Sequence, residues 1–240
     1  MVRPLTFGRN INMQWETPAK PAELTEQRII NGILEGIFEI NGYLPSEREL
    51  ANQLGVTRPT LREALQRLSR DGWVEIHQGK PTRVRDYWIE GNLNVLSTIA
   101  KYSNKLPENF VSNLLQVRLC LCPTYTLLAS QNKPEEIINF LEKSPNITST
   151  PEEFSIYDFS LHQKLTQNSG NPIFTLILNG FMDLFIQNAV IYFSNPIARE
   201  HSSAFYKNLQ TAIRNEQPHQ IFEITKKTME ESIHIWILAQ

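Results

Sequence analysis

The chain has 240 residues, of which 41% are hydrophobic, and its formal net charge at neutral pH is −2. This length allows one or two domains with buried cores, and the near-neutral charge does not by itself indicate a nucleic-acid partner. Because the sequence contains neither an uninterrupted apolar run of membrane-spanning length nor a signal-peptide pattern, we expect a soluble, cytoplasmic protein that does not bind membranes.

The first segment, residues 1–20, is polar, contains proline and has no periodicity, so we expect a disordered extension. Residues 21–38 follow, with isoleucines and leucines at helical spacing. This pattern predicts an amphipathic helix that packs beneath the next elements.

A helix-turn-helix is predicted in the segment that comes next. Ser46 and Glu49 have the spacing of a capping box, in which each side chain satisfies a backbone amide at a helix start. Gly55 tolerates the left-handed conformation at which this first helix can end. Thr57 is a favourable N-cap, and it predicts a second helix that begins near Arg58.

The second helix has two different faces. Its apolar side chains recur at helical spacing and are Leu61, Ala64, Leu65 and Leu68. A polar arc of about 80° on another side holds Arg58, Arg62, Gln66 and Ser69. Guanidinium groups suit phosphate oxygens and the guanine edge, so this arc is a candidate for reading DNA in the major groove. The alternative is a solvated basic face on an ordinary helical hairpin.

A short β-hairpin is predicted directly afterwards. Strand-like runs at residues 73–76 and 82–84 flank a turn that contains Gly79 and Lys80. This arrangement is typical of a winged helix-turn-helix, whose wing would place Gly79 near the sugar-phosphate backbone and Lys80 beside a phosphate. The segment from Arg48 to Arg85 holds eight Lys and Arg against four Asp and Glu, so the basic charge is local.

The remainder of the sequence predicts an all-helical domain at residues 93–240, joined by a linker at residues 87–92 to a DNA-binding domain at residues 21–86. The fold class is therefore mainly α, with a small β-wing and a bundle of seven helices. The seven helical segments, most of which begin at or near a proline, are residues 93–102, 107–130, 134–142, 151–168, 172–193, 196–215 and 218–239.

The segment 172–193 is apolar on nearly every side. Such a helix is usually the buried centre of a bundle, but it can equally line an elongated apolar cavity. The sequence leaves both interpretations open.

The sequence resembles the GntR superfamily of bacterial transcription factors, and within it the branch with a FadR-type C-terminal domain. The matching stretches are LPSERELANQLGVTRPTLREALQRLSRDGW, GKPT in the wing, NLLQVR, SGNPIFTLILNG, YFSNPIAR and FYKNL, and the similarity spans about residues 20–238. The resemblance implies a homodimer that represses fatty acid degradation and activates unsaturated fatty acid synthesis. It also implies that long-chain acyl-CoA, the effector, releases the protein from a palindromic operator, with no further cofactor.

By position, the resemblance implies DNA contacts at Arg48, Thr57, Arg58, Thr60, Arg62, Gln78, Gly79 and Lys80. Two positions depart from the pattern of this branch. Pro59 stands where a threonine is usual, and Gln78 stands where the wing usually has a histidine.

The resemblance also implies acyl-CoA contacts at Arg118, Tyr192, Ser232 and Trp236. Further candidates around them are His162, Phe185, Lys226, Lys227 and Met229. The residues themselves support part of this set, because Ser232 and Trp236 share one helix face with Thr225 and Met229 within about 60°.

Two alternative functions compete with this interpretation. Related domains bind a metal through one aspartate and three histidines, and Asp158 with His162 matches the first two ligands, whereas the other two positions hold Tyr206 and Ser232. The sequence thus predicts no metal, and the alternative is a metal-dependent regulator of a small carboxylate that uses Asp158 and His162. An enzyme is not expected, because no nucleophile elbow, phosphate loop or HExxH motif occurs.

Overall fold

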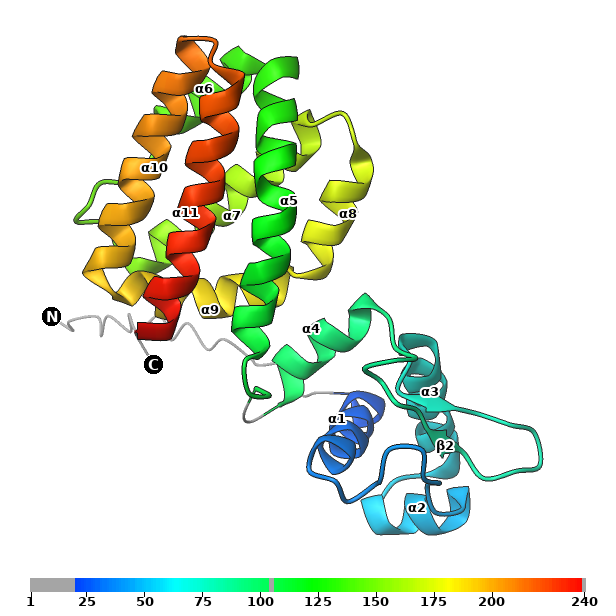
Figure 1. Cartoon of the computed structure of the whole chain (residues 1–240). Coiled ribbons are helices and arrows are strands. Elements are labelled where there is room, and N and C mark those ends of the chain that lie inside the picture. The colour runs from blue at the N-terminus through cyan, green and yellow to red at the C-terminus, as the bar shows by residue number, and fades with distance from the viewer. Residues whose placement is uncertain (1–19, 104–105, 239–240) are drawn as a thin grey trace, which may run out of the picture. The chain divides into compact units, whose positions relative to one another are not determined.

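The computed structural model describes residues 20–103 and 106–238, which form two compact units (Figure 1). The winged unit contains the described residues up to Arg70 together with Val74–Val84. The helical unit contains Asp71–Trp73 and the described residues from Arg85 onward. The predicted disordered extension lies outside the described residues, apart from Lys20 at the start of the first helix.

The winged unit consists of three helices and a two-stranded sheet. The elements are α1 (Pro21–Leu34), α2 (Glu47–Leu54), α3 (Arg58–Asp71), β1 (Val74–Glu75) and β2 (Arg83–Val84). The prediction that α1 extends to residue 38 is wrong. The backbone turns at Gly36, whose φ is 77°, and the amide of Phe38 donates back to the Gly32 carbonyl at 2.9 Å.

The predicted capping and turn signals of α2 and α3 are confirmed. The Ser46 hydroxyl accepts from the Glu49 amide at 3.3 Å, and the Glu49 carboxylate accepts from the Ser46 amide at 3.2 Å. The Ser46 hydroxyl also donates to the Glu49 carboxylate at 2.7 Å, and this bond, followed by the one from the Ser46 amide, lowers the pKa of Glu49. Gly55 ends α2 in the left-handed conformation at φ 67°, and α3 begins at Arg58.

The hairpin is shorter than the predicted strand runs. Val74 pairs with Val84, and Glu75 pairs with Arg83, in antiparallel register. The Glu75 carboxylate also accepts from the Arg83 guanidinium at 2.9 Å. This pairing fixes the base of the wing on the body of the unit.

The described part of the helical unit contains eight helices, and not the seven that were predicted. They are α4 (Leu93–Tyr102), α5 (Phe110–Asn132), α6 (Pro134–Leu141), α7 (Pro151–Asn168), α8 (Pro172–Gly180), α9 (Met182–Ser194), α10 (Pro196–Arg214) and α11 (Pro218–Leu238). Proline occupies the first helical position of α6, α7, α8, α10 and α11. Its missing N–H costs nothing there, because that N–H would have no acceptor within the helix.

The additional helix arises because the segment 172–193 breaks into α8 and α9. Glycine is a poor helix former, and the chain leaves helical geometry after Gly180, where Phe181 has a φ of −105° and a ψ of 1°. The Ser97 hydroxyl of α4 donates to the Gly180 carbonyl at 3.0 Å. Segments Pro172–Gly180 and Leu184–Ser194 are bent by 63°, and only as a pair do they have the length and composition to cross a membrane, which no single described helix has.

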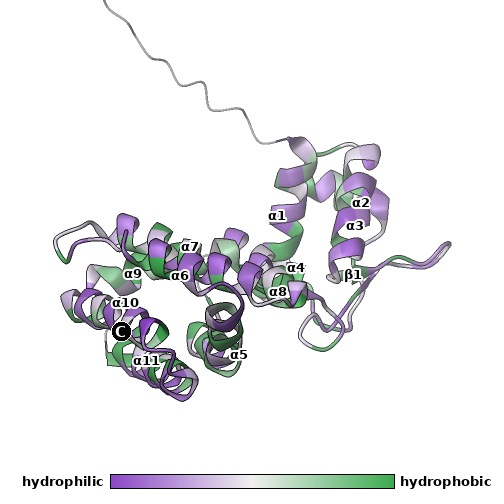
Figure 2. Ribbon diagram, turned by 90° about the horizontal axis from the view of Figure 1, so that it is seen from above, coloured by the Kyte–Doolittle hydropathy of each residue, from purple (hydrophilic) through white to green (hydrophobic). Residues whose placement is uncertain are grey.

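The core of the helical unit lies between α5, α7, α10 and α11. Phe154, Leu161 and Leu165 of α7 are completely buried, together with Leu209 of α10. Figure 2 shows that these helices contain both apolar and polar residues. α11 runs alongside α5 (Figure 1), and α8 and α9 pack against α7.

Candidate functional sites

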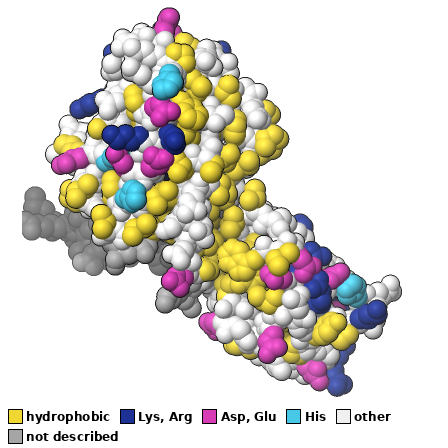
Figure 3. All heavy atoms as spheres, viewed as in Figure 1, with side chains coloured by type: hydrophobic (Ala, Val, Ile, Leu, Met, Phe, Trp, Pro, Cys, Tyr) yellow, Lys and Arg dark blue, Asp and Glu magenta, His cyan; other side chains and the backbone are white. Residues whose placement is uncertain are grey.

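The polar arc predicted on α3 faces solvent. Arg58, Arg62 and Gln66 are exposed, whereas the apolar residues of the same helix are 2% exposed or less. Figure 3 shows dark blue Lys and Arg side chains on the surface of the winged unit, in the lower part of the view. The helix therefore presents a basic face on one side and packs on the other.

Arg62 is held by an acidic residue of α2. Its Nε donates to Glu47 Oε2 at 2.8 Å, and the Arg62 side chain remains 64% exposed. This hydrogen bond uses Nε and does not involve the two terminal nitrogens of the guanidinium. Those nitrogens form the fork that can contact guanine or phosphate oxygens.

The threonines at the start of α3 are engaged in capping. Thr57 Oγ1 accepts from the Thr60 amide at 3.3 Å and lies 2.9 Å from the Thr60 hydroxyl. Both hydroxyls lie beside the exposed first turn of α3, and Arg48 is exposed on α2. The N-terminal end of α3 therefore combines two hydroxyls and arginine side chains at the positive end of the helix dipole, which together favour a negatively charged ligand.

The tip of the wing is fully exposed at Gln78, Gly79 and Lys80. Gly79 has a φ of 74°, and no atom lies within 4 Å of the position that a Cβ would occupy. A side chain there would be disfavoured by the backbone conformation and would project into open space. Glycine thus keeps the tip narrow enough for close approach to another backbone.

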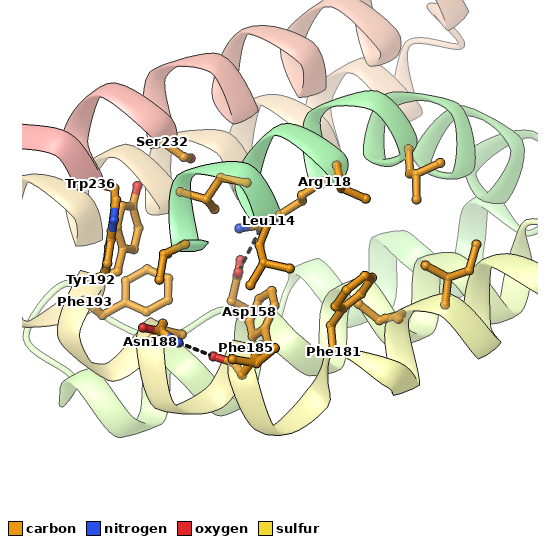
Figure 4. A pocket seen from close by; sticks show the side chains of 18 of the residues that line it. Leu114, Arg118, Asp158, Phe181, Phe185, Asn188, Tyr192, Phe193, Ser232 and Trp236 are labelled. Carbon is orange, nitrogen blue, oxygen red and sulfur yellow. Dashed lines mark hydrogen bonds and ion pairs between the residues drawn. The ribbon is translucent and has the colours of Figure 1, made fainter. Parts of the chain in front are cut away.

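The helical unit contains an apolar cavity between α5, α7, α8, α9 and α11 (Figure 4). Side chains of α8 and α9, including Phe174, Ile177, Phe181 and Phe185, form one wall. No residue of α8 is buried, whereas Leu184 and Phe193 of α9 are buried. The segment 172–193 therefore lines a cavity along its whole length and contributes to the buried core only through α9.

Five of the predicted ligand residues line this cavity. They are Arg118, Phe185, Tyr192, Ser232 and Trp236 (Figure 4). The predicted inward face of α11 is confirmed, since Thr225, Met229, Ser232 and Trp236 are all buried.

The other predicted ligand residues lie elsewhere. Met229 packs in the hydrophobic core, and His162 is completely buried behind Arg118. Lys226 and Lys227 are exposed on α11, where their ammonium groups lie 3.9 Å from Glu230 and 3.7 Å from Glu231. None of the described residues that line the cavity is a lysine, and any role of Lys226 and Lys227 must be at the surface.

A charged cluster forms the floor of the cavity. Arg118 Nη2 donates to Asp158 Oδ2 at 3.0 Å, and the Tyr206 hydroxyl donates to Asp158 Oδ1 at 2.9 Å. The same Arg118 nitrogen contacts His162 Nε2, and His162 Nδ1 lies 2.9 Å from the Tyr125 hydroxyl. Burial of the charges is thus compensated within the cluster.

These contacts define the protonation of His162. A guanidinium can only donate, so Nε2 accepts from Arg118 and Nδ1 carries the proton that reaches the Tyr125 hydroxyl. Burial, and then the positive charge of Arg118, lower the pKa of His162 to about 3. The imidazole is therefore neutral at physiological pH, and Arg118 with Asp158 form a charge-balanced pair.

The donor set does not suit a divalent cation. Asp158 Oδ2 and His162 Nε2 lie 3.7 Å apart, but the Arg118 guanidinium is bonded to both. Tyr206 donates its proton to Asp158, and no group of three or more His, Cys, Asp or Glu within the described ranges could hold a metal. Two protein ligands rarely hold zinc or nickel.

Two buried N–H groups in the cavity wall lack a hydrogen-bond partner among the described atoms. They are Arg118 Nε and Trp236 Nε1. Both groups are donors, and a buried donor without a partner carries a desolvation cost that a ligand can relieve. The cavity is therefore suited to a molecule that is largely apolar and contains hydrogen-bond acceptors.

Sequence reasoning missed Tyr125 as the partner of His162. A signal was present, because Arg118, Cys122 and Tyr125 follow the i, i+4, i+7 pattern of one helix face. Cys122 Sγ also lies 3.6 Å from His162 Nδ1. That pattern alone, however, does not indicate which residue of another helix the face will meet.

Comparison with known proteins gives two family matches. Residues 21–84 match the family of bacterial regulatory proteins called gntR, and residues 85–240 match the FadR C-terminal domain. Proteins named "Fatty acid metabolism regulator protein" from Yersinia pestis (strain Pestoides F) and Yersinia pseudotuberculosis serotype O:1b (strain IP 31758) are each 38% identical over 216 residues, 90% of this chain and 90% of theirs.

The fold is also found among solved structures. Lar, described as controlling expression of the Listeria monocytogenes agr system, has a TM-score of 0.63 at 14% identity. The match covers 94% of this chain and 100% of that chain. At this identity the likeness concerns the fold alone.

Proposed function

The chain belongs to the gntR family of bacterial regulatory proteins and carries a FadR C-terminal domain, and from this we propose that it regulates fatty acid metabolism by releasing DNA when long-chain acyl-CoA binds. As a member of this family it is a transcription regulator and not an enzyme, as the sequence predicted. In our proposal it represses genes of fatty acid degradation and activates genes of unsaturated fatty acid synthesis. The relatives named above support the metabolic assignment.

The proposal assigns DNA binding to residues 21–86, a linker to residues 87–92 and effector binding to residues 93–240. The exposed arc of Arg58, Arg62 and Gln66 would enter the major groove, and the Gly79–Lys80 tip would contact the backbone or minor groove. Two copies in a homodimer would read the halves of a palindromic operator. Family membership favours this role over a merely solvated basic face.

One observation carries the choice of effector: the unpaired donors Arg118 Nε and Trp236 Nε1 belong to residues that line a largely apolar cavity. A long acyl chain fits the apolar wall, and the carbonyl and amide oxygens of an acyl thioester supply acceptors. The exposed Lys226 and Lys227 could meet the phosphates of CoA outside the cavity. As lysines they offer charge without the two-pronged geometry of arginine.

The Arg118–Asp158 pair further favours a neutral acceptor. Asp158 neutralises the guanidinium at 3.0 Å, and His162 is neutral, so the cluster has no net positive charge to attract a carboxylate. A free fatty acid would have to bury its charge beside Asp158, at a cost that an uncharged thioester avoids. We therefore expect the thioester to bind more tightly than the free acid.

A route from the cavity to DNA passes through α4, the helix that follows the wing and linker along the chain. Phe181 lines the cavity, and the neighbouring Gly180 carbonyl accepts from Ser97 of α4. A ligand that displaces the α8–α9 junction would therefore displace α4. Release requires that the ligand bind more tightly to the arrangement that does not bind DNA.

The alternative, a metal-dependent regulator of a small carboxylate, has less support. It needs Asp158 and His162 as ligands, and both already bond to Arg118. A metal would have to displace a guanidinium whose charge it would then oppose.

The test is a fluorescence-anisotropy titration of a labelled palindromic operator with the protein, repeated with oleoyl-CoA, oleate, free CoA, and zinc with a small dicarboxylate. We expect release by micromolar oleoyl-CoA only. Trp236→Phe should keep an aromatic ring, lose the unpaired N–H and weaken the response, whereas Tyr157→Phe, outside the cavity lining, should respond like the wild type. Release only by zinc with the dicarboxylate would support the alternative function, and no operator binding would contradict both.

A further inference from the structure

A second cavity of the helical unit adjoins the first. Its own lining comes from α4, the start of α5 and the segment before α4, and it includes Leu93, Leu96, Phe110 and Trp88. The side chains that line both cavities are Leu114, Val117, Leu121, Ile177 and Phe181. These five apolar side chains, here called the partition, are the boundary between the two spaces.

The first cavity has a polar end and an apolar end. In Figure 4, Ser232, Trp236 and Tyr192 lie at one end, Phe181 lies toward the other, and Arg118 with Asp158 lies between them. A ligand whose acceptor group bonds to Trp236, at the polar end, can extend its apolar part along the cavity toward Phe181. Phe181 belongs to the partition, so the tail of such a ligand points at the second cavity.

The partition can yield to a ligand at low cost. Its members are hydrocarbon side chains, and none of the five is completely buried. Phe181 stands between α8 and α9, and its hydrocarbon ring can rotate without breaking a hydrogen bond, because the bonds of this residue are made by its backbone. Dispersion contacts with an entering methylene chain would replace those lost between the partition residues.

The chemistry of the second cavity fits the same tail. Leu93, Leu96, Phe110 and Trp88 offer hydrocarbon and aromatic surface, and Leu93 and Trp88 are 43% and 51% exposed. Its polar members Glu108 and Asn113 are exposed. Covering this apolar surface with a methylene chain would be favourable in proportion to the area removed from water.

We propose that the second cavity receives the distal methylene groups of a long acyl chain, with Phe181 as the divider that the chain must pass. The inference rests on the proposed function and specifies how effector length is selected. Short acyl chains end within the first cavity, whereas long chains displace Phe181 and reach Leu96 and Leu93. Residues of the partition and of α4 thereby determine which chain lengths act as effectors.

The experiment is calorimetric titration of the full chain with saturated acyl-CoA thioesters of eight, twelve, sixteen and eighteen carbons. Leu96→Trp fills the second cavity from α4, and Leu128→Trp is the matched control, because Leu128 is half-buried on α5 and lines neither cavity. Each methylene kept out of the second cavity should cost about fourfold in affinity. We expect Leu96→Trp to bind the two longest thioesters at least about tenfold more weakly and the shortest one unchanged.

A second variant guards against a failure of Leu96→Trp to fold, which circular dichroism would detect. Phe181→Ala removes the divider and should increase the ratio of eighteen-carbon to twelve-carbon affinity above that of the wild type. Parallel length profiles for the wild type and the folded variants would overturn the inference while leaving acyl-CoA binding intact. If no thioester of any length binds the wild type, the proposed function itself fails.

Discussion

The basic face of α3 and the cavity floor place their arginines in opposite environments. The Arg62 side chain is 64% exposed and pairs with Glu47 at 2.8 Å, whereas the Arg118 side chain is 19% exposed and pairs with Asp158 at 3.0 Å. An exposed ion pair is worth little and exchanges readily for another anion, but a buried pair cannot lose one partner without a large cost. The first arrangement suits transient reading of DNA, and the second suits a fixed scaffold for a ligand.

Removing the buried acid should have the largest effect. Asp158→Asn leaves the Arg118 charge buried without a counter-charge, so we expect a loss of about 3–5 kcal/mol in the free energy of unfolding. Urea denaturation followed by tryptophan fluorescence measures it. Glu142→Gln is the control, because it breaks an exposed pair with Arg214 at 2.7 Å and should cost less than about 1 kcal/mol. Similar losses of unfolding free energy in both variants would show that the buried pair is no more important for stability than an exposed one.

Removing the exposed arginine should affect binding and not folding. Arg62→Ala should weaken operator binding by about 1–3 kcal/mol and relax the base preference at one position, because a forked donor to a base edge is lost. Anisotropy titrations against operators with single base changes measure both effects. Arg214→Ala removes the same charge from an exposed position of the helical unit and should leave base preference unchanged. Unaltered selectivity in Arg62→Ala would exclude this residue from the reading face.

The neutral state of His162 should appear in the pH dependence of stability. Its pKa is about 3 in the folded chain and near 6.5 when unperturbed, so the unfolded chain binds the extra proton first. Stability is thus fully present above pH 6.5 and falls by about 1.4 kcal/mol per pH unit as the pH drops toward 3. The difference in stability between the wild type and His162→Gln at each pH gives the contribution of His162, separate from that of the carboxyl groups. Equal slopes for the two proteins would show that His162 is not held neutral.

The smallest effect is expected at the partner of Arg62. Glu47→Gln frees the guanidinium from its ion pair at 2.8 Å and removes a negative charge near the DNA, so stability should change by less than about 1 kcal/mol. Affinity for non-operator DNA should rise slightly, and discrimination of the operator should fall. Glu63→Gln is the matched control, because Glu63 pairs with Arg67 on a different side of α3. Equal changes in both variants would indicate a general charge effect.

The two regions also differ in how far the sequence predicts them. The caps of α2 and α3 depend on neighbours three residues apart, such as Ser46 with Glu49, so local sequence contains all that determines them. The bond between His162 and Tyr125 joins residues 37 positions apart on two helices. Periodicity places each on an inward face but does not specify which inward faces meet.

The α8–α9 break shows a further limit. Apolar residues continue through Gly180 without a change of period, so the pattern predicts one helix. The break is stabilised by a distant residue, since the Ser97 hydroxyl of α4 donates to the Gly180 carbonyl at the bend. The cavity, which depends on this bend, was therefore an open alternative until the three-dimensional arrangement was known.

The central claim is that the exposed reading face and the buried cavity are coupled. The most direct measurement is the affinity of oleoyl-CoA for the protein alone and for the protein saturated with its operator duplex, each by calorimetric titration at the same salt concentration. Because coupling between two binding sites is reciprocal, the operator should weaken oleoyl-CoA binding by the same factor by which oleoyl-CoA weakens operator binding. Equal affinity for oleoyl-CoA with and without operator would contradict the account.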